Sequence, residues 1–128
     1  MNLLLDTHAF LWAIADDPRM SQSARAAFLD PANALYFSMA SAWEIAIKKS
    51  LGKLKLSGRW QLWLAREMTR NGIAWLPIEF RHCARVTSLR FHHRDPFDRL
   101  IVAQALLERH AILSADAIFD RYGIRRIW

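Results

Sequence analysis

The chain has 128 residues, of which 53% are hydrophobic, and this predicts one domain with an apolar core rather than a disordered segment. The 18 Lys and Arg residues outnumber the 12 Asp and Glu residues, and the net charge of +6 favours nucleic acid or an acidic protein as a partner. A single cysteine excludes an internal disulfide and a cysteine-rich metal site. The sequence has no signal-peptide pattern and no apolar run long enough to span a membrane, which favours a cytoplasmic protein with no membrane partner.

Short apolar runs alternate with segments of helical periodicity along the whole chain. We expect strands over residues 3–5, 34–38, 73–78, 111–114 and 124–128. We expect helices over residues 7–13, 21–29, 40–51, 58–71, 79–89, 97–109 and 117–122. This alternation predicts an α/β fold, in which a mostly parallel central sheet of about five short strands carries helices on both faces.

Four carboxylates stand at the ends of these apolar segments or one turn into a helix: Asp6, Glu44, Asp98 and Asp116. Asp6 and Asp116 each follow a predicted strand directly, so both belong at the carboxyl edge of the sheet, where open α/β sheets bind ligands. Acidic groups beside buried segments are costly unless something pairs with them, and one shared cation would pair with all four. The sequence therefore favours a metal site and phosphate chemistry.

Helix capping offers a local alternative for every one of these acids. Ser41 and Glu44 fit a capping box, with Ser41 as N-cap, and Asp95 and Asp98 repeat the pattern around a proline at the first helical position. The other two acids would cap the helices that follow them. Capping does not explain why all four should converge on one edge.

Four segments in this order and spacing resemble the PIN-domain proteins, and among them the VapC toxins of bacterial type II toxin–antitoxin modules. The segments are LLLDTH at 3–8, SAWEIAIK at 41–48, HRDPFDRLI at 93–101 and LSAD at 113–116. The resemblance spans nearly the whole chain and implies a PIN-like fold over residues 1–128. It also implies Mg²⁺- or Mn²⁺-dependent cleavage of RNA and inhibition by a cognate antitoxin.

By position in these motifs, the resemblance makes Asp6, Glu44, Asp98 and Asp116 the catalytic and metal-binding quartet. We expect the first and third to bind metal directly, the second to bind metal or orient water, and the fourth to act through water. Asp116 departs most from the family pattern, because many relatives have a threonine shortly before the aspartate where this chain has Ser114 and Ala115.

Residues around the quartet have less specific interpretations. Thr7 and Ser114 are expected to hydrogen-bond the carboxylates. Contact with RNA phosphates is expected of His92, His93, Arg94 and Arg99, and an exposed loop is the alternative for the two histidines. A basic stretch at the end of the Glu44 helix is expected to steer RNA or simply to favour the helix C-terminus: Lys48, Lys49, Lys53 and Lys55. Trp60, Trp63 and Met68 belong either to the core or to a groove for an antitoxin helix, and such a patch would also serve a homodimer.

Other functions stay open on the sequence alone. A DNA-cutting nuclease of the same superfamily would use the same metal chemistry. A receiver-like module needs paired acids after its first strand, and a haloacid-dehalogenase-like phosphatase needs Asp-x-Asp, whereas this chain has only Asp6-Thr7-His8 there. A non-catalytic PIN domain or another α/β module that only binds RNA or protein is the last alternative, and retention of all four acids argues against it.

Overall fold

The computed structural model describes all 128 residues and contains the alternating elements expected from the sequence. The strands are β1 (Asn2–Leu5), β2 (Ala34–Ser38), β3 (Ile73–Leu76), β4 (Ala111–Leu113) and β5 (Arg126–Ile127). The helices are α1 (Thr7–Ile14), α2 (Gln22–Leu29), α3 (Met39–Ser50), α4 (Trp60–Arg70), α5 (Phe80–Val86), α6 (Pro96–Glu108) and the 3₁₀ helix η1 (Ala117–Tyr122). No helix is both long enough and apolar enough to cross a membrane.

All five strands form one parallel sheet in the order β3-β2-β1-β4-β5, which confirms the predicted parallel α/β fold. β1 lies at the centre, where Leu3 pairs with Leu35 on one side and with Ala111 on the other. The chain order reverses at β1, because β2 continues to one edge while β4 and β5 extend the opposite one. The carboxyl end of β1 is therefore the position where such sheets bind ligands.

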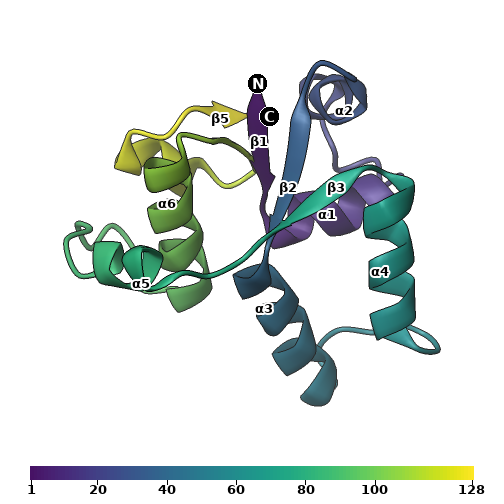
Figure 1. Ribbon diagram of the computed structural model, residues 1–128. Helices are drawn as coiled ribbons and strands as arrows, with labels where there is room; N and C mark the ends of the chain where they lie inside the picture. The colour runs from purple at the N-terminus through teal and green to yellow at the C-terminus, as the bar shows by residue number, and fades with distance from the viewer.

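Helices cover both faces of this sheet, and alternation along β1 separates two apolar cores (Figure 1). Leu3 and Leu5 pack on the face that carries α1, α2 and α4, with Phe10 and Phe37 stacked at 4.2 Å between ring centroids. Leu4 packs on the opposite face, against the buried side of α6. Both faces of β1 are thus buried, which explains its uninterrupted run of leucines.

Several element ends differ from the prediction. The α5 helix ends at Val86 rather than at residue 89, and the last strand contains only Arg126 and Ile127. The α6 helix ends at Glu108, and Arg109 follows with a positive φ of 57°, a conformation that glycine usually supplies. Of the apolar residues of α4, Met68 is buried, whereas Trp60 and Trp63 are half-buried and pack against the core edge.

Candidate active site

The four acids predicted from the sequence line one cavity at the carboxyl edge of the sheet. β1 and β2 end close to where α1 and α3 begin (Figure 1). The lining side chains come from the start of α1, from α3 beyond its first turn, and from the starts of α6 and η1. The cavity has a volume of about 190 Å³ and no hydrophobic residue in its lining. Its lining residues are Asp6, Thr7, His8, Glu44, Lys48, Asp95, Asp98 and Asp116.

Asp6 is the most buried aspartate of the cavity and is held from two sides. Its Oδ1 caps α1 by accepting the Ala9 N–H at 2.7 Å, and its Oδ2 accepts the hydroxyl of Ser114. Burial raises the pKa of Asp6 above its ordinary value, although these two hydrogen bonds act in the opposite direction. The carboxylate is therefore fixed in orientation but shielded from water, and a bound cation would compensate its charge.

Glu44 lies inside α3 and is not part of a capping box, so that prediction was wrong. The N-cap of α3 is Ser38, whose Oγ accepts the Ala40 N–H at 3.0 Å, and Ser41 is a buried residue of the helix itself. Glu44 thus lies more than one turn into the helix and faces the cavity. Because no backbone N–H is free there, side chains must satisfy its carboxylate.

Two side chains bind Glu44 from opposite directions. Thr7 donates its hydroxyl to Oε1 at 2.6 Å, and Lys48 donates to Oε2 at 2.8 Å from the next turn of the same helix. Glu44 is buried, so the Lys48 ammonium compensates the charge that burial would otherwise oppose. Lys48 was expected to steer RNA or to favour the helix C-terminus, and the structure pairs it with an acid of the cavity.

Asp98 faces the cavity from the first turn of α6, three residues after the N-cap residue Asp95. Asp95 accepts the N–H groups of Phe97 at 2.9 Å and Asp98 at 3.1 Å, which confirms the predicted cap. Burial and then the neighbouring charges of Asp95 and Glu44 raise the pKa of Asp98 to about 7. In the metal-free protein, burial and the neighbouring carboxylates together oppose the negative charge of Asp98.

His93 was expected either to contact RNA phosphates or to lie exposed in a loop, and the structure places it half-buried beside Asp98. Its Nε2 is buried 3.4 Å from Oδ2 of Asp98, at an angle that makes no hydrogen bond, and its Nδ1 lies 2.7 Å from the Tyr122 hydroxyl. Arg99 was expected near RNA phosphates, yet it is buried and donates to the Arg90 carbonyl at 2.9 Å. The sequence could not predict the contact of His93 with Asp98 or that of Arg99 with Arg90, because each forms between α6 and the loop that precedes it.

Asp116 is the most exposed of the four acids and caps η1. Its Oδ1 accepts the Ile118 N–H at 3.0 Å, and its own N–H donates to Oγ of Ser114 at 3.0 Å. The hydroxyl of Ser114 therefore hydrogen-bonds both Asp6 and Asp116, and hydrogen bonding to the carboxylates is what we expected of Ser114. The Asp116 side chain extends from the rim of the cavity rather than from its floor.

The most closely spaced group of potential ligands lies outside this cavity, where Glu79, His82 and Glu108 place one ligand atom each within 4.8 Å of the others. It is a closed network between α5 and α6. Nδ1 of His82 accepts the Glu79 N–H at 2.9 Å, so Nε2 carries the proton and donates to Glu108 at 2.9 Å. Both ring nitrogens of His82 are therefore already hydrogen-bonded, so the histidine has no free ligand atom for a metal. Glu108 is in addition paired with Arg81.

The chemistry of the acidic cavity fits a hard divalent cation. Its donors are carboxylate and hydroxyl oxygen atoms together with the imidazole of His8, and the predominance of oxygen suits Mg²⁺ or Mn²⁺ better than Zn²⁺. Lys48 is the only lysine or arginine in the lining and is already paired with Glu44, so His8 beside Asp6 is the only other basic side chain near the aspartates. The cavity can therefore hold a metal ion and, with it, a phosphate group.

Comparison with known proteins places this site in a family. The model of the PIN domain matches residues 3–125. No curated protein was found to match the chain in sequence. Among solved structures, VapBC2 from Rickettsia felis bound to a promoter DNA fragment is similar at a TM-score of 0.74 and 18% identity, covering 98% of this chain and 97% of that one.

Two further structures show the same architecture at the same identity of 18%. VapBC-1 from nontypeable Haemophilus influenzae has a TM-score of 0.67, with 98% of this chain and 96% of that chain covered. FitAcB from Neisseria gonorrhoeae has a TM-score of 0.64, with 97% and 95% covered. Likeness at this identity establishes the fold, and the match of the family model over nearly the whole chain establishes more: this protein belongs to the PIN-domain family.

Proposed function

We propose that this protein is a metal-dependent endoribonuclease and the toxin of a toxin–antitoxin pair. The observation that carries the proposal is the convergence of Asp6, Glu44, Asp98 and Asp116 on one cavity without hydrophobic lining. Burial and the crowding of these acids raise the pKa of Asp98, and this arrangement is unfavourable unless a cation is bound. Membership of a nuclease superfamily supports hydrolysis of phosphodiester bonds as the reaction.

Each acid has a role that follows from how it is held. Asp6 and Asp98 face the cavity from helix N-termini and are the direct ligands of Mg²⁺ or Mn²⁺. Glu44, fixed by Thr7 and Lys48, binds the cation or orients the attacking water through its carboxylate. The exposed Asp116 lies at the rim of the cavity and would contact the cation through a bridging water. The chemistry that the cation supplies when bound is polarisation of a phosphoryl oxygen and activation of water.

The toxin role is supported by the kind of assemblies in which the similar folds occur. The similar structures are described as VapBC complexes from two bacteria, FitAcB and a toxin–antitoxin complex from Klebsiella pneumoniae. We therefore propose a cognate antitoxin as the protein partner and RNA as the substrate. A homodimer is the oligomeric state that we expect, and light scattering of the purified protein tests it.

RNA cleavage by the purified protein tests the nuclease directly. We expect cleavage with Mg²⁺ or Mn²⁺, none with EDTA, and no cleavage by Asp6→Asn or Asp98→Asn. Asp30→Asn is the matched control, because Asp30 is exposed and remote from the cavity, and the change in charge is the same. Preference for DNA over RNA of the same sequence would replace the proposal with a DNA nuclease.

Expression in a bacterial host tests the toxin role separately. We expect growth arrest and loss of RNA with the wild type, relief of both by Asp98→Asn, and no relief by Asp30→Asn. Growth arrest that persists with Asp98→Asn would show that toxicity does not need the acidic cavity, and the nuclease mechanism would then be wrong.

A further inference from the structure

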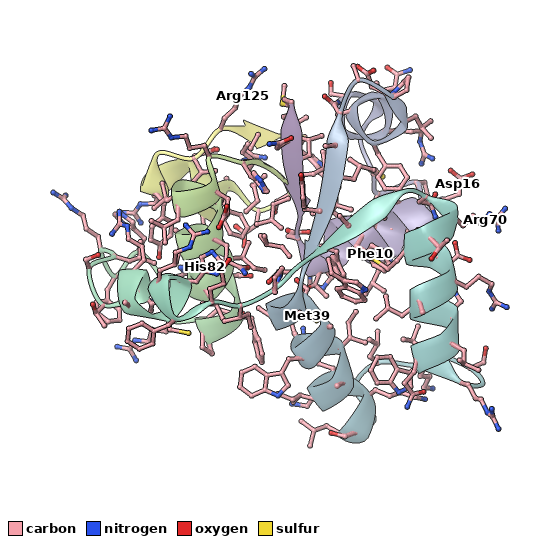
Figure 2. All side chains as sticks on the ribbon, in the orientation of Figure 1. Phe10, Asp16, Met39, Arg70, His82 and Arg125 are labelled. Atoms are coloured by element: carbon pink, nitrogen blue, oxygen red, sulfur yellow. The ribbon has the colours of Figure 1, made fainter.

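A second cavity, larger and opposite in charge, lies beside the acidic one. It has a volume of about 450 Å³ and no acidic residue in its lining. Arg85 reaches it from α5, Arg90 and His92 from the loop that follows, and Arg121 from η1. Nitrogen-tipped side chains gather in this region around α5 and α6 (Figure 2). We call this cavity the basic cleft.

None of the three arginines that line the basic cleft has a carboxylate partner. Five other arginines do have carboxylate partners: Arg19, Arg25, Arg70, Arg81 and Arg126. Arg90 and Arg121 are exposed, and Arg85 donates only to the hydroxyl of Ser88. Three guanidinium groups around one hollow repel one another unless an anion enters it.

A buried charge beneath the cleft adds to this potential. Arg99 is only 5% exposed and has no carboxylate partner. It donates instead to the backbone carbonyls of Arg90 at 2.9 Å and Val86 at 3.3 Å, so it fixes the loop that carries the rim. Partial burial and the charges of Arg121 and Arg90 lower the pKa of His92, which is consistent with a positive potential. A buried arginine therefore supports the backbone of the loop that carries Arg90 and His92.

The basic cleft is connected to the acidic cavity through two side chains. Tyr122 lines the cleft, and its hydroxyl lies 2.7 Å from Nδ1 of His93. The other ring nitrogen of His93 lies 3.4 Å from Asp98, which lines the acidic cavity. One imidazole ring therefore separates the two cavities, and one polymer can occupy both.

An aromatic side chain between the basic residues favours single-stranded nucleic acid over an acidic protein. Phe91 stands between Arg90 and His92 and is 81% exposed, with the Arg99 guanidinium 4.1 Å from its ring centroid. An exposed aromatic ring beside backbone-binding arginines is the arrangement that stacks bases of a single strand. An acidic peptide would need the arginines but not the ring.

We propose that the basic cleft binds the phosphates of a single-stranded RNA next to the scissile nucleotide, with Phe91 stacking on a base. This inference rests on the proposed ribonuclease function and adds a substrate site beside the acidic cavity. Contacts to the phosphate backbone position RNA without reading its sequence, so the cleft would hold and orient RNAs of different sequence.

Binding without metal tests the cleft independently of cleavage. A fluorescent single-stranded RNA oligonucleotide is titrated in EDTA with the wild type, with Arg90→Gln/Arg121→Gln, and with Arg66→Gln/Arg125→Gln. The control pair removes the same two charges from exposed positions outside the cleft. We expect the cleft variant to lower the slope of log affinity against log salt by about 1.4, because each single-strand phosphate contact contributes about 0.7.

Phe91→Leu separates RNA from an acidic protein segment as the ligand. We expect RNA binding about tenfold weaker from the loss of stacking. If Phe91→Leu binds RNA like the wild type and polyglutamate displaces RNA at equal charge, the cleft takes an acidic protein and the proposal fails. It also fails if the cleft and control pairs lose equal affinity, since that is a general charge effect.

Cleavage assays keep this inference distinct from the proposed function. If the wild type cleaves RNA, the cleft variant should raise KM with kcat nearly unchanged, because the acidic cavity is intact. If the wild type cleaves nothing but binds RNA through the cleft in EDTA, the ribonuclease proposal falls and the binding site stands.

Discussion

Replacement of Asp98 by asparagine should stabilise the metal-free protein at pH 8. Burial first, and then the charges of Asp95, Glu44, Asp6 and Asp116, raise the pKa of Asp98 from 3.8 to about 7. The folded state therefore binds a proton more readily than the unfolded state between these two pH values. Stability conferred by that proton is complete below pH 3.8 and is lost as the pH rises through about 7.

The size of the effect follows from the shift in pKa. About three units would correspond to about 4 kcal/mol if the carboxyl were fully shielded from water. Its side chain is 23% exposed, so solvent screens part of this energy, and we expect about 1–2 kcal/mol. For a chain of this length, that corresponds to an increase in Tm of about 3–8 °C for Asp98→Asn at pH 8.

Thermal unfolding in EDTA, followed by circular dichroism at pH 4, 6 and 8, measures this effect. We expect the advantage of Asp98→Asn to be largest at pH 8 and to fade toward pH 4, with no such trend for Asp30→Asn. Added Mn²⁺ should raise the Tm of the wild type more than that of Asp98→Asn. An asparagine variant that is less stable than the wild type at pH 8 would refute the electrostatic reasoning.

Two further predictions concern the helix that carries Glu44. Ser38→Ala should cost about 2 kcal/mol in urea unfolding, because it removes an N-cap and leaves Gln104 without the hydroxyl now 2.5 Å away. Ser41→Ala should be nearly neutral in the same experiment, since the Ser41 hydroxyl is buried without a partner. Lys48→Gln should tighten Mn²⁺ binding in calorimetry, because it removes the ammonium that now competes for Glu44; weaker binding would contradict this.

The sequence predicts the fold well because the pattern that specifies it is local. Leu3–Leu5 is apolar at every position because both faces of the central strand are buried, and such runs indicate a parallel sheet. Asp95 before Pro96 is an equally local signal, and the structure has the helix start that it predicts. Asp6 and Asp116 could be assigned to one edge because each directly follows a strand of that sheet.

The sequence could not predict the contacts between separate helices, strands and loops. Ser38 and Ser41 are both plausible caps by residue type, and the choice depends on where β2 stops pairing with β3. Lys48 looked like one of several basic residues near a helix end, yet it lies one turn from Glu44 and pairs with it. His93 contacts Asp98 only because the loop before α6 folds back over it. These are tertiary effects, which override local patterns.

The way in which the acids are held implies that the site is preformed. Backbone N–H groups at helix starts fix Asp6, Asp95 and Asp116, and side chains fix Glu44, so a cation is not needed to orient these carboxylates. Asp98 differs, because no hydrogen bond holds its carboxylate and its neighbours oppose its charge. Burial also raises the pKa of Asp6, so metal binding should act by ionising both Asp6 and Asp98 and by ordering Asp98. Metal affinity should then rise steeply as the pH passes through 7, while the rest of the cavity stays unchanged.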